Sequence, residues 1–149
     1  MILVPVGCLQ HGHKFLVQQR KPEALRGGLW EMPGGKREPG ETMALTLQRE
    51  WLEEVGIEIA VHELLAECAL SFPDAPDVLL PLFRVTVSSH TLPAAQEGQK
   101  LAWMTLEELE PLAMVPSMYK YWTALEKLSA DESDSAVLWT TAPEVQSTL

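Results

Sequence analysis

Residues 34–59, which read GGKREPGETMALTLQREWLEEVGIEI, decide most of what can be predicted about this chain. Thr42 is a suitable N-cap and Gly56 a suitable residue after the last turn, so the stretch predicts a helix over residues 42–55. At about 100° per residue, Glu50, Glu53 and Glu54 share one third of the helix circumference. The other side carries Ala44, Leu45, Leu47, Trp51, Leu52 and Val55. The sequence therefore predicts a helix with one broad buried face and three exposed carboxylates.

This placement of the carboxylates destabilises the helix. Glu50 and Glu54 form a like-charged i,i+4 pair, which costs roughly 0.2–0.5 kcal/mol. All three acids lie near the negative end of the helix dipole, which destabilises the helix by roughly 0.3–1 kcal/mol for each exposed charge. The patch is either a solvated acidic face or a site for a hard cation, Mg²⁺ or Mn²⁺. Because local violations gathered on one patch tend to mark functional sites, the pattern favours the cation.

The rest of the chain predicts one mixed α/β (α+β) domain over residues 1–128. Strands are expected at 2–9, 14–18, 29–32, 78–87 and 100–104, and residues 57–71 read as a mixture of strand and loop. Pro81, inside the expected strand 78–87, requires a bulge or an edge position. Thr105 and Glu108 form a capping box for a short helix. A second long helix is expected at 116–128, and residues 129–149 form a tail of uncertain structure.

Composition limits the classes of function. The chain has 149 residues and a formal net charge of −10, which argues against binding a nucleic-acid polymer without sequence preference. No apolar run is long enough to span a membrane, and residues 1–10 lack the features of a signal peptide. We therefore expect a cytoplasmic protein in which Cys8 and Cys68 are free thiols.

The spacing in the opening stretch is specific. Gly35 is followed after five residues by Glu41, and seven residues later Arg49-Glu50-Trp51-Leu52-Glu53-Glu54-Val55-Gly56-Ile57 begins. This resembles the Nudix box, G-x5-E-x7-R-E-U-x-E-E-x-G-U, where U is a bulky apolar residue. Residues 30–36 (WEMPGGK) are similar to the W/L-E-F-P-G-G-K stretch of MutT-like members. The resemblance implies the Nudix fold, a mixed β-sheet sandwiched between α-helices, and hydrolysis of a nucleoside diphosphate linked to another group.

The resemblance also implies roles for individual residues. Magnesium or manganese ligands would be the Gly35 carbonyl, Glu50, Glu53, Glu54 and Glu97. Arg49 would orient a metal-binding glutamate, and Glu41 would support the loop or a further ion. Either Glu53 or Glu97 would be the base that activates water. The catalytic set implied in this way is Arg49, Glu53, Glu54 and Glu97.

Five further residues are candidates for substrate binding. Arg20 and Lys36 would contact phosphates, with solvated surface charge as the alternative. Trp30 and Met32 would line the base pocket, with core packing as the alternative. Ungapped counting from Trp103 places Met118 where MutT-like enzymes that act on 8-oxo-dGTP have an asparagine. Because Met32 and Met118 would form a soft, adaptable wall, we expect a broad preference among bases.

The expected partner is a small-molecule nucleotide, and the chain is expected to be a monomer or a homodimer. The predicted reaction is magnesium-dependent hydrolysis of a nucleoside triphosphate to a nucleoside monophosphate and pyrophosphate, in nucleotide-pool sanitation. The alternatives within the enzyme class are a nucleotide sugar, a dinucleotide or capped RNA. A non-catalytic Nudix-fold nucleotide-binding module is the alternative outside that class.

Overall fold

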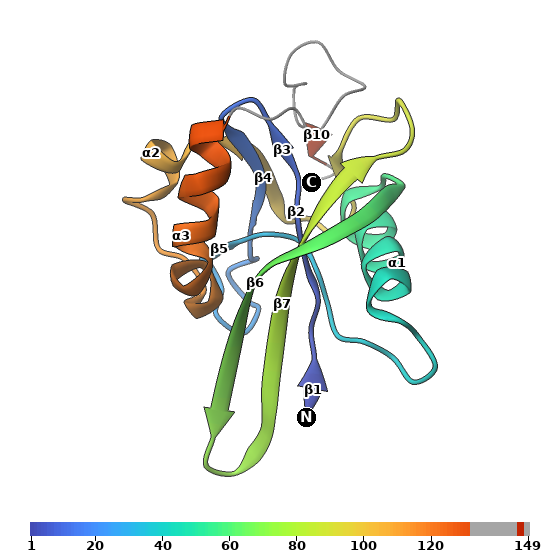
Figure 1. Ribbon diagram of the computed structural model, residues 1–149, viewed down its shortest axis with the longest axis vertical. Coiled ribbons are helices and arrows are strands. Elements are labelled where there is room, and N and C mark those ends of the chain that lie inside the picture. The colour runs from blue at the N-terminus through green and yellow to red at the C-terminus, as the bar shows by residue number, and fades with distance from the viewer. Residues whose placement is uncertain (132–145, 148–149) are drawn as a thin grey trace.

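The first of two four-stranded sheets is built on a long hairpin, β6 (Ile59–Phe72) and β7 (Ala75–Val87). The computed structural model describes residues 1–131 and 146–147. Two short strands, β1 (Ile2–Leu3) and β2 (Val6–Cys8), run parallel to β7, while β6 pairs with β7 in the antiparallel sense. The hairpin reaches past the body of the molecule (Figure 1). The expected mixture of strand and loop over residues 57–71 is therefore wrong, because β6 runs through most of it as one strand with register shifts.

The second sheet is centred on β4 (Lys14–Gln19). β4 pairs in the antiparallel sense with β9 (Lys100–Met104), β3 (Gln10–His11) and β5 (Trp30–Glu31). A further parallel pair joins β8 (Ala94–Ala95) to β10 (Gln146–Ser147).

Helices cover both sides of the strands, as predicted (Figure 1). α1 (Met43–Val55) lies on one side, and α2 (Leu106–Leu109) and α3 (Pro116–Asp131) lie on the other. The predicted ends of α1 are confirmed, since Thr42 accepts a hydrogen bond from the Leu45 amide and Gly56 has a left-handed φ of 74°. The capping box of Thr105 and Glu108 is also present. Among the described helices, none is long and apolar enough to cross a membrane.

α3 differs from the sequence prediction at its end. It continues to Asp131, so the first residues of the expected tail are helical. The rest of that tail, residues 132–145 and 148–149, lies outside the described residues.

Pro81 occupies an internal strand, which corrects the expected edge position. β7 lies between β6 and the pair β1 and β2, and no register shift occurs at Pro81. The parallel register pairs Leu3 with Leu79 and Val6 with Leu82, so Pro81 faces the break between β1 and β2. A proline, which has no amide N–H to donate, is tolerated there because the neighbouring strand is interrupted opposite it.

Two hydrophobic clusters form the core. One contains Phe15 and Val17 and packs against α3, and the other contains Leu16 and packs against α1. Trp51 is the largest side chain of the second cluster, and its indole N–H donates to the Pro33 carbonyl at 3.0 Å. The buried face of α1 is narrower than predicted, because Leu45 and Leu52 are 52% and 53% exposed.

Candidate functional site

Arg49 is the centre of an ion-pair network at the start of the candidate site. Its guanidinium donates two hydrogen bonds to the Glu41 carboxylate, at 2.7 and 2.9 Å, and one to Glu50 at 2.7 Å. It also reaches the Lys36 carbonyl at 3.2 Å and Glu53 at 3.4 Å. The network therefore ties the loop before α1 to the acidic face of the helix.

Glu50 lies against the backbone of the glycine pair. Its side chain is 17% exposed, and burial is the main reason that its pKa is raised despite the contact with Arg49. A Cβ atom placed on Gly35 would collide with the Glu50 carboxylate. The absence of a side chain at position 35 is therefore what lets this carboxylate approach the loop.

Glu54 corrects the prediction of three exposed carboxylates. Of the three, only Glu53 is exposed, while Glu50 and Glu54 are both partly buried, and one carboxylate oxygen of Glu54 is fully buried. Burial, reinforced by the charges of Glu50, Glu31 and Glu97, raises the pKa of Glu54 to about 9. Its Oε2 atom has no hydrogen-bond partner among the described residues.

A buried pair of glutamines adjoins Glu54. The Gln18 side-chain amide donates to Glu31 at 3.1 Å and lies 3.5 Å from the Glu54 carboxylate. Gln99 donates to the Gln18 oxygen at 3.2 Å and to the Glu54 carbonyl at 2.7 Å, and it accepts from the Glu97 amide. Sequence reasoning missed both residues. The available signal was strand alternation, which places Gln18 on the same face of β4 as Leu16, toward α1.

Glu97 lies close to Glu54. It is exposed and lines a cavity of about 180 Å³ together with Glu54, Glu31 and both glutamines. The structure thus brings the predicted Glu97 to the acids of α1, across more than 40 positions in the sequence.

The acids fit a hard divalent cation, although they do not converge by themselves. Within residues 1–131 and 146–147, no group of three or more His, Cys, Asp or Glu side chains is arranged to hold a metal ion as it stands. Like charges repel when no cation lies between them. Two observations fit such an ion: the unpartnered buried oxygen of Glu54 and the close approach of Glu50 to the Gly35 backbone. The donors are all oxygens, which suits Mg²⁺ or Mn²⁺.

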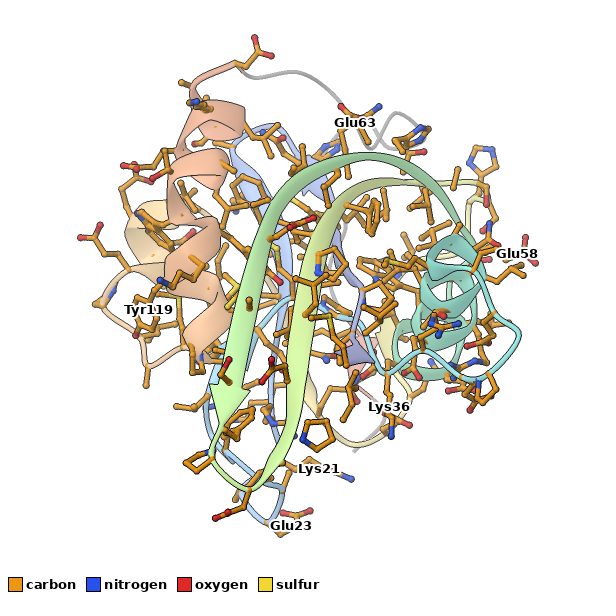
Figure 2. All side chains as sticks on the ribbon, turned by 60° about the horizontal axis from the view of Figure 1, so that its bottom comes forward. Lys21, Glu23, Lys36, Glu58, Glu63 and Tyr119 are labelled. Atoms are coloured by element: carbon orange, nitrogen blue, oxygen red, sulfur yellow. The ribbon has the colours of Figure 1, made fainter. Side chains whose placement is uncertain are left out.

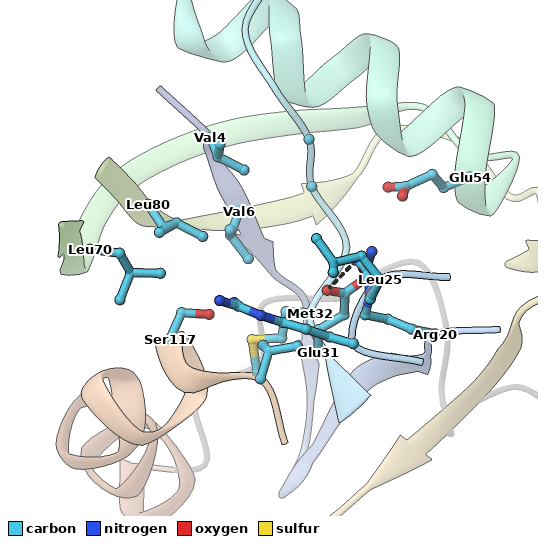
Figure 3. Close-up of a pocket in the computed structure, with 14 residues that line it drawn as sticks. Val4, Val6, Arg20, Leu25, Glu31, Met32, Glu54, Leu70, Leu80 and Ser117 are labelled. Carbon is cyan, nitrogen blue, oxygen red and sulfur yellow. Dashed lines mark hydrogen bonds and ion pairs between the residues drawn. The ribbon is translucent and has the colours of Figure 1, made fainter. Parts of the chain in front are cut away.

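A larger cavity of about 240 Å³ opens beside these acids (Figure 3). Glu54 lies at one end of it, Gly35 also lines it, and the residues at the other end come from the β6–β7 hairpin and the start of α3. Its apolar lining consists of Val4, Val6, Leu25, Met32, Leu70, Leu80 and Val115. The cavity therefore joins an acidic end to an apolar interior.

The predicted substrate residues are placed unequally around this cavity. Arg20 lines it and pairs with Glu31 at 3.2 Å, and Met32 forms part of its wall. Lys36 is exposed on the connection before α1 and does not line it (Figure 2). Trp30 is half-buried and packs against the core.

Met118 lies in the core instead of the cavity wall. It is fully buried in the cluster beneath α3, and the neighbouring Ser117 lines the cavity in its place. Consecutive helical residues point about 100° apart, so counting along the sequence selected the wrong side of the helix. Arg26, which sequence reasoning also missed, lines the cavity from the loop between β4 and β5. Among the described residues it is the only non-glycine with a positive φ, at 57°.

Comparison with known proteins identifies the family. The model of the NUDIX domain matches residues 2–125. An 8-oxo-dGTP diphosphatase from Proteus vulgaris is 41% identical over 57% of this chain and 74% of the relative. A CTP pyrophosphohydrolase from Escherichia coli K12 is 33% identical over 78% of this chain and 85% of the relative. The solution structure of the E. coli ORF135 protein superposes with a TM-score of 0.74 at 32% identity, covering 88% of this chain and 92% of that one.

Proposed function

The chain belongs to the NUDIX family and is a pyrophosphohydrolase, and from this premise we propose that it hydrolyses a nucleoside triphosphate to the monophosphate and pyrophosphate. The observation that carries the proposal is the composition of the larger cavity. Glu54 and Gly35 line it next to the ion-pair network of Arg49, and most of the remaining lining is apolar. Such a cavity suits a ligand with an anionic end and a planar, largely apolar end.

The acidic end would hold Mg²⁺ or Mn²⁺. The ligands would be Glu50, Glu53, Glu54, Glu97 and the Gly35 carbonyl. A bound divalent cation supplies charge neutralisation to the phosphates and acidifies water. Without it, the net charge of −10 repels a polyphosphate.

The chain's own residues would orient and bind the substrate. Arg49 holds Glu50 in place through a 2.7 Å hydrogen bond, and Arg20 is held by Glu31 at the cavity wall. Arg26 and Arg20 are the two arginines of the cavity and would contact phosphate oxygens. Glu97 or Glu53, both exposed, would accept the proton of the attacking water.

A panel assay tests this function. Purified protein is incubated with CTP, UTP, dGTP and 8-oxo-dGTP, and in parallel with a nucleotide sugar, a dinucleotide and capped RNA, each in Mg²⁺, in Mn²⁺ or in EDTA. The products are identified by mass. We expect the monophosphate and pyrophosphate in either metal and no product in EDTA. Release of inorganic phosphate and a nucleoside diphosphate would contradict the proposed bond cleavage. Turnover of a nucleotide sugar, a dinucleotide or capped RNA alone would move the substrate to another class in this family.

Nucleotide-pool sanitation is the biological role that this activity would serve. A nucleotide-binding module without catalysis is the second candidate, and it predicts saturable binding with no product under any metal. Every acid of the box is present in this chain, which favours the enzyme.

A further inference from the structure

Gln99 is a buried amide between an exposed loop and the end of a helix. It is 7% exposed and directly precedes β9, whereas Glu97, two residues earlier, is exposed. Gly98 between them has a left-handed φ of 79°, and this turn brings the Gln99 side chain back to the Glu97 backbone. The Gln99 oxygen accepts from the Glu97 amide at 3.0 Å. Gln99 therefore holds the backbone of a residue that is a candidate metal ligand or general base.

The other end of the Gln99 amide is bonded to α1. Its nitrogen donates to the Glu54 carbonyl at 2.7 Å, and the Gln96 backbone amide donates to the same carbonyl at 3.0 Å. This carbonyl lies in the last turn of α1, where carbonyls lack a partner within the helix. Gln99 thus connects the loop that carries Glu97 to the helical turn that carries the Glu54 carboxylate.

Backbone groups fix the direction of the Gln99 amide. A backbone N–H only donates and a backbone carbonyl only accepts, so the Gln99 oxygen faces Glu97 and its nitrogen faces Glu54. The second proton of that nitrogen goes to the Gln18 side-chain oxygen at 3.2 Å. A flipped amide would set donor against donor and acceptor against acceptor, so one orientation alone satisfies these contacts.

Electrostatic repulsion acts against the position of Glu97. Burial is the main reason that the pKa values of Glu50 and Glu54 are raised, and the charge of Glu97 raises both further. Because like charges repel and the Glu97 side chain is exposed, packing does little to hold this carboxylate beside the other two. Its position therefore depends on the backbone of the loop, which Gln99 and Gln96 bond to α1.

We propose that Gln99 is a positioning residue for the hydrolysis, which fixes the loop that carries Glu97 beside Glu54. This inference rests on the proposed function and adds to it a residue outside the Nudix box. In this role Gln99 acts through Glu97 and not on the substrate, whether Glu97 binds the cation or activates water. Because a displacement of about 1 Å can slow a reaction about a hundredfold, loss of this restraint should lower kcat.

Two substitutions of Gln99 and one matched control test the role. Gln99→Met keeps the length of the side chain and removes both the donor and the acceptor. Gln99→Asn keeps the amide but is one methylene too short to reach both backbone groups, and it replaces the first variant if methionine prevents folding. Gln10→Met is the control. Gln10 is 2% exposed and also donates to backbone carbonyls, those of Gly12 and Leu128, but it lines neither cavity of the candidate site.

A double substitution separates positioning from packing. The values of kcat and KM are measured in Mg²⁺ for CTP, UTP, dGTP and 8-oxo-dGTP, and melting temperatures are measured in EDTA. Gln99→Met should lower kcat about tenfold to a hundredfold and change KM less than about threefold. In a Glu97→Gln background it should change kcat less than about twofold, because the carboxylate that it positions is already absent.

The melting temperature should respond differently from kcat. Gln99→Met should lower it equally in both backgrounds, since Glu97→Gln retains the backbone N–H that bonds to Gln99. Gln10→Met should lower the melting temperature and leave kcat unchanged.

Hydrogen exchange gives a readout that does not depend on turnover. In the metal-free wild-type protein, the Glu97 amide should be protected by its hydrogen bond to Gln99. Gln99→Met should speed the exchange of this amide about tenfold, and Gln10→Met should leave it unchanged.

Four results would overturn the inference: an unchanged kcat in Gln99→Met, an equal fractional loss of kcat with and without the Glu97 carboxylate, wild-type turnover in Glu97→Gln, or unchanged exchange of the Glu97 amide. A purely structural role would give the second result. The proposed function fails separately, since a wild-type protein that turns over none of the four nucleotides contradicts it. Exchange of the Glu97 amide then still tests whether Gln99 holds the loop.

Discussion

Arg49 binds Glu41 through two hydrogen bonds, from Nε to Oε2 at 2.7 Å and from Nη2 to Oε1 at 2.9 Å. Glu41 also accepts from the Glu38 amide and from the Thr46 hydroxyl. These contacts, the Arg49 hydrogen bonds above all, lower the pKa of Glu41 to about 2. Glu41, which lies away from the other acids, therefore has a structural role. It fixes the position of Arg49, and Arg49 in turn fixes the position of Glu50.

Glu41→Gln should destabilise the protein at neutral pH. Because the folded pKa of Glu41 is lowered from 4.5 to about 2, its ionisation stabilises the fold above about pH 4.5 and loses this effect as the pH falls toward 2. Thermal unfolding of both proteins across this range is the measurement, with Glu23→Gln in the exposed loop as control. A difference in melting temperature that does not shrink on acidification would contradict the role of the ion pair.

Glu53→Gln and Glu54→Gln should each reduce turnover at least about a hundredfold while the fold persists. The reason is that both carboxylates belong to the candidate cation site, Glu53 exposed and Glu54 partly buried. Steady-state kinetics in Mg²⁺ and circular dichroism check the two halves of this prediction. Near-wild-type rates in both variants would remove these residues from the site.

Glu54→Gln should also stabilise the metal-free protein at alkaline pH. The folded pKa of Glu54 is raised to about 9, so between about pH 4.5 and 9 the unfolded chain releases a proton that the folded protein keeps. The stability of the wild-type protein therefore falls as the pH rises through this window, and the contribution is absent in the variant. Melting curves in EDTA from pH 5 to 9 measure this. Parallel pH profiles of the two proteins would show that Glu54 is not the cause.

Glu97→Gln should slow turnover by on the order of 10²–10⁴ if Glu97 is the general base. Its position beside Glu54 on the wall of the smaller cavity is the reason for the assignment. The pH profile of kcat distinguishes a lost base from a lost ligand. A reduction below about tenfold would leave Glu53 as the base.

Gly35→Ala should lower the rate of turnover, with a relatively smaller effect on the melting temperature. The reason is that the alanine Cβ would displace the Glu50 carboxylate from the loop. Gly12→Ala is the matched control. Gly12 has a φ of 61° and open space around it, so alanine there strains the backbone by about 1 kcal/mol without touching the site. Kinetics and melting temperature are measured for both variants. Equal effects on turnover would indicate a general loss of stability.

The helix ends and the spacing of the acidic residues could be predicted from the sequence. The ends of α1 follow from Thr42 and Gly56, whose capping acts over three or four residues. The spacing of the box from Gly35 to Ile57 identified the family and the acids. It did so because a helix converts fixed sequence intervals into fixed positions on one face.

Only the tertiary structure decided which of these side chains are buried. Glu54 was predicted to be an exposed carboxylate, yet it is partly buried and meets Gln18, which lies 36 positions away in the sequence. Ser117 replaces Met118 at the cavity because the hairpin and α3 pack with the methionine inward. The burial and hydrogen bonding of a side chain depend on neighbours that the fold brings from distant parts of the chain. A local sequence pattern therefore does not predict them. The sequence by itself therefore determined the family, the helix and its acids. The packing of α1 and α3 against the sheets determined the ionisation of Glu54 and the side chain that faces the cavity.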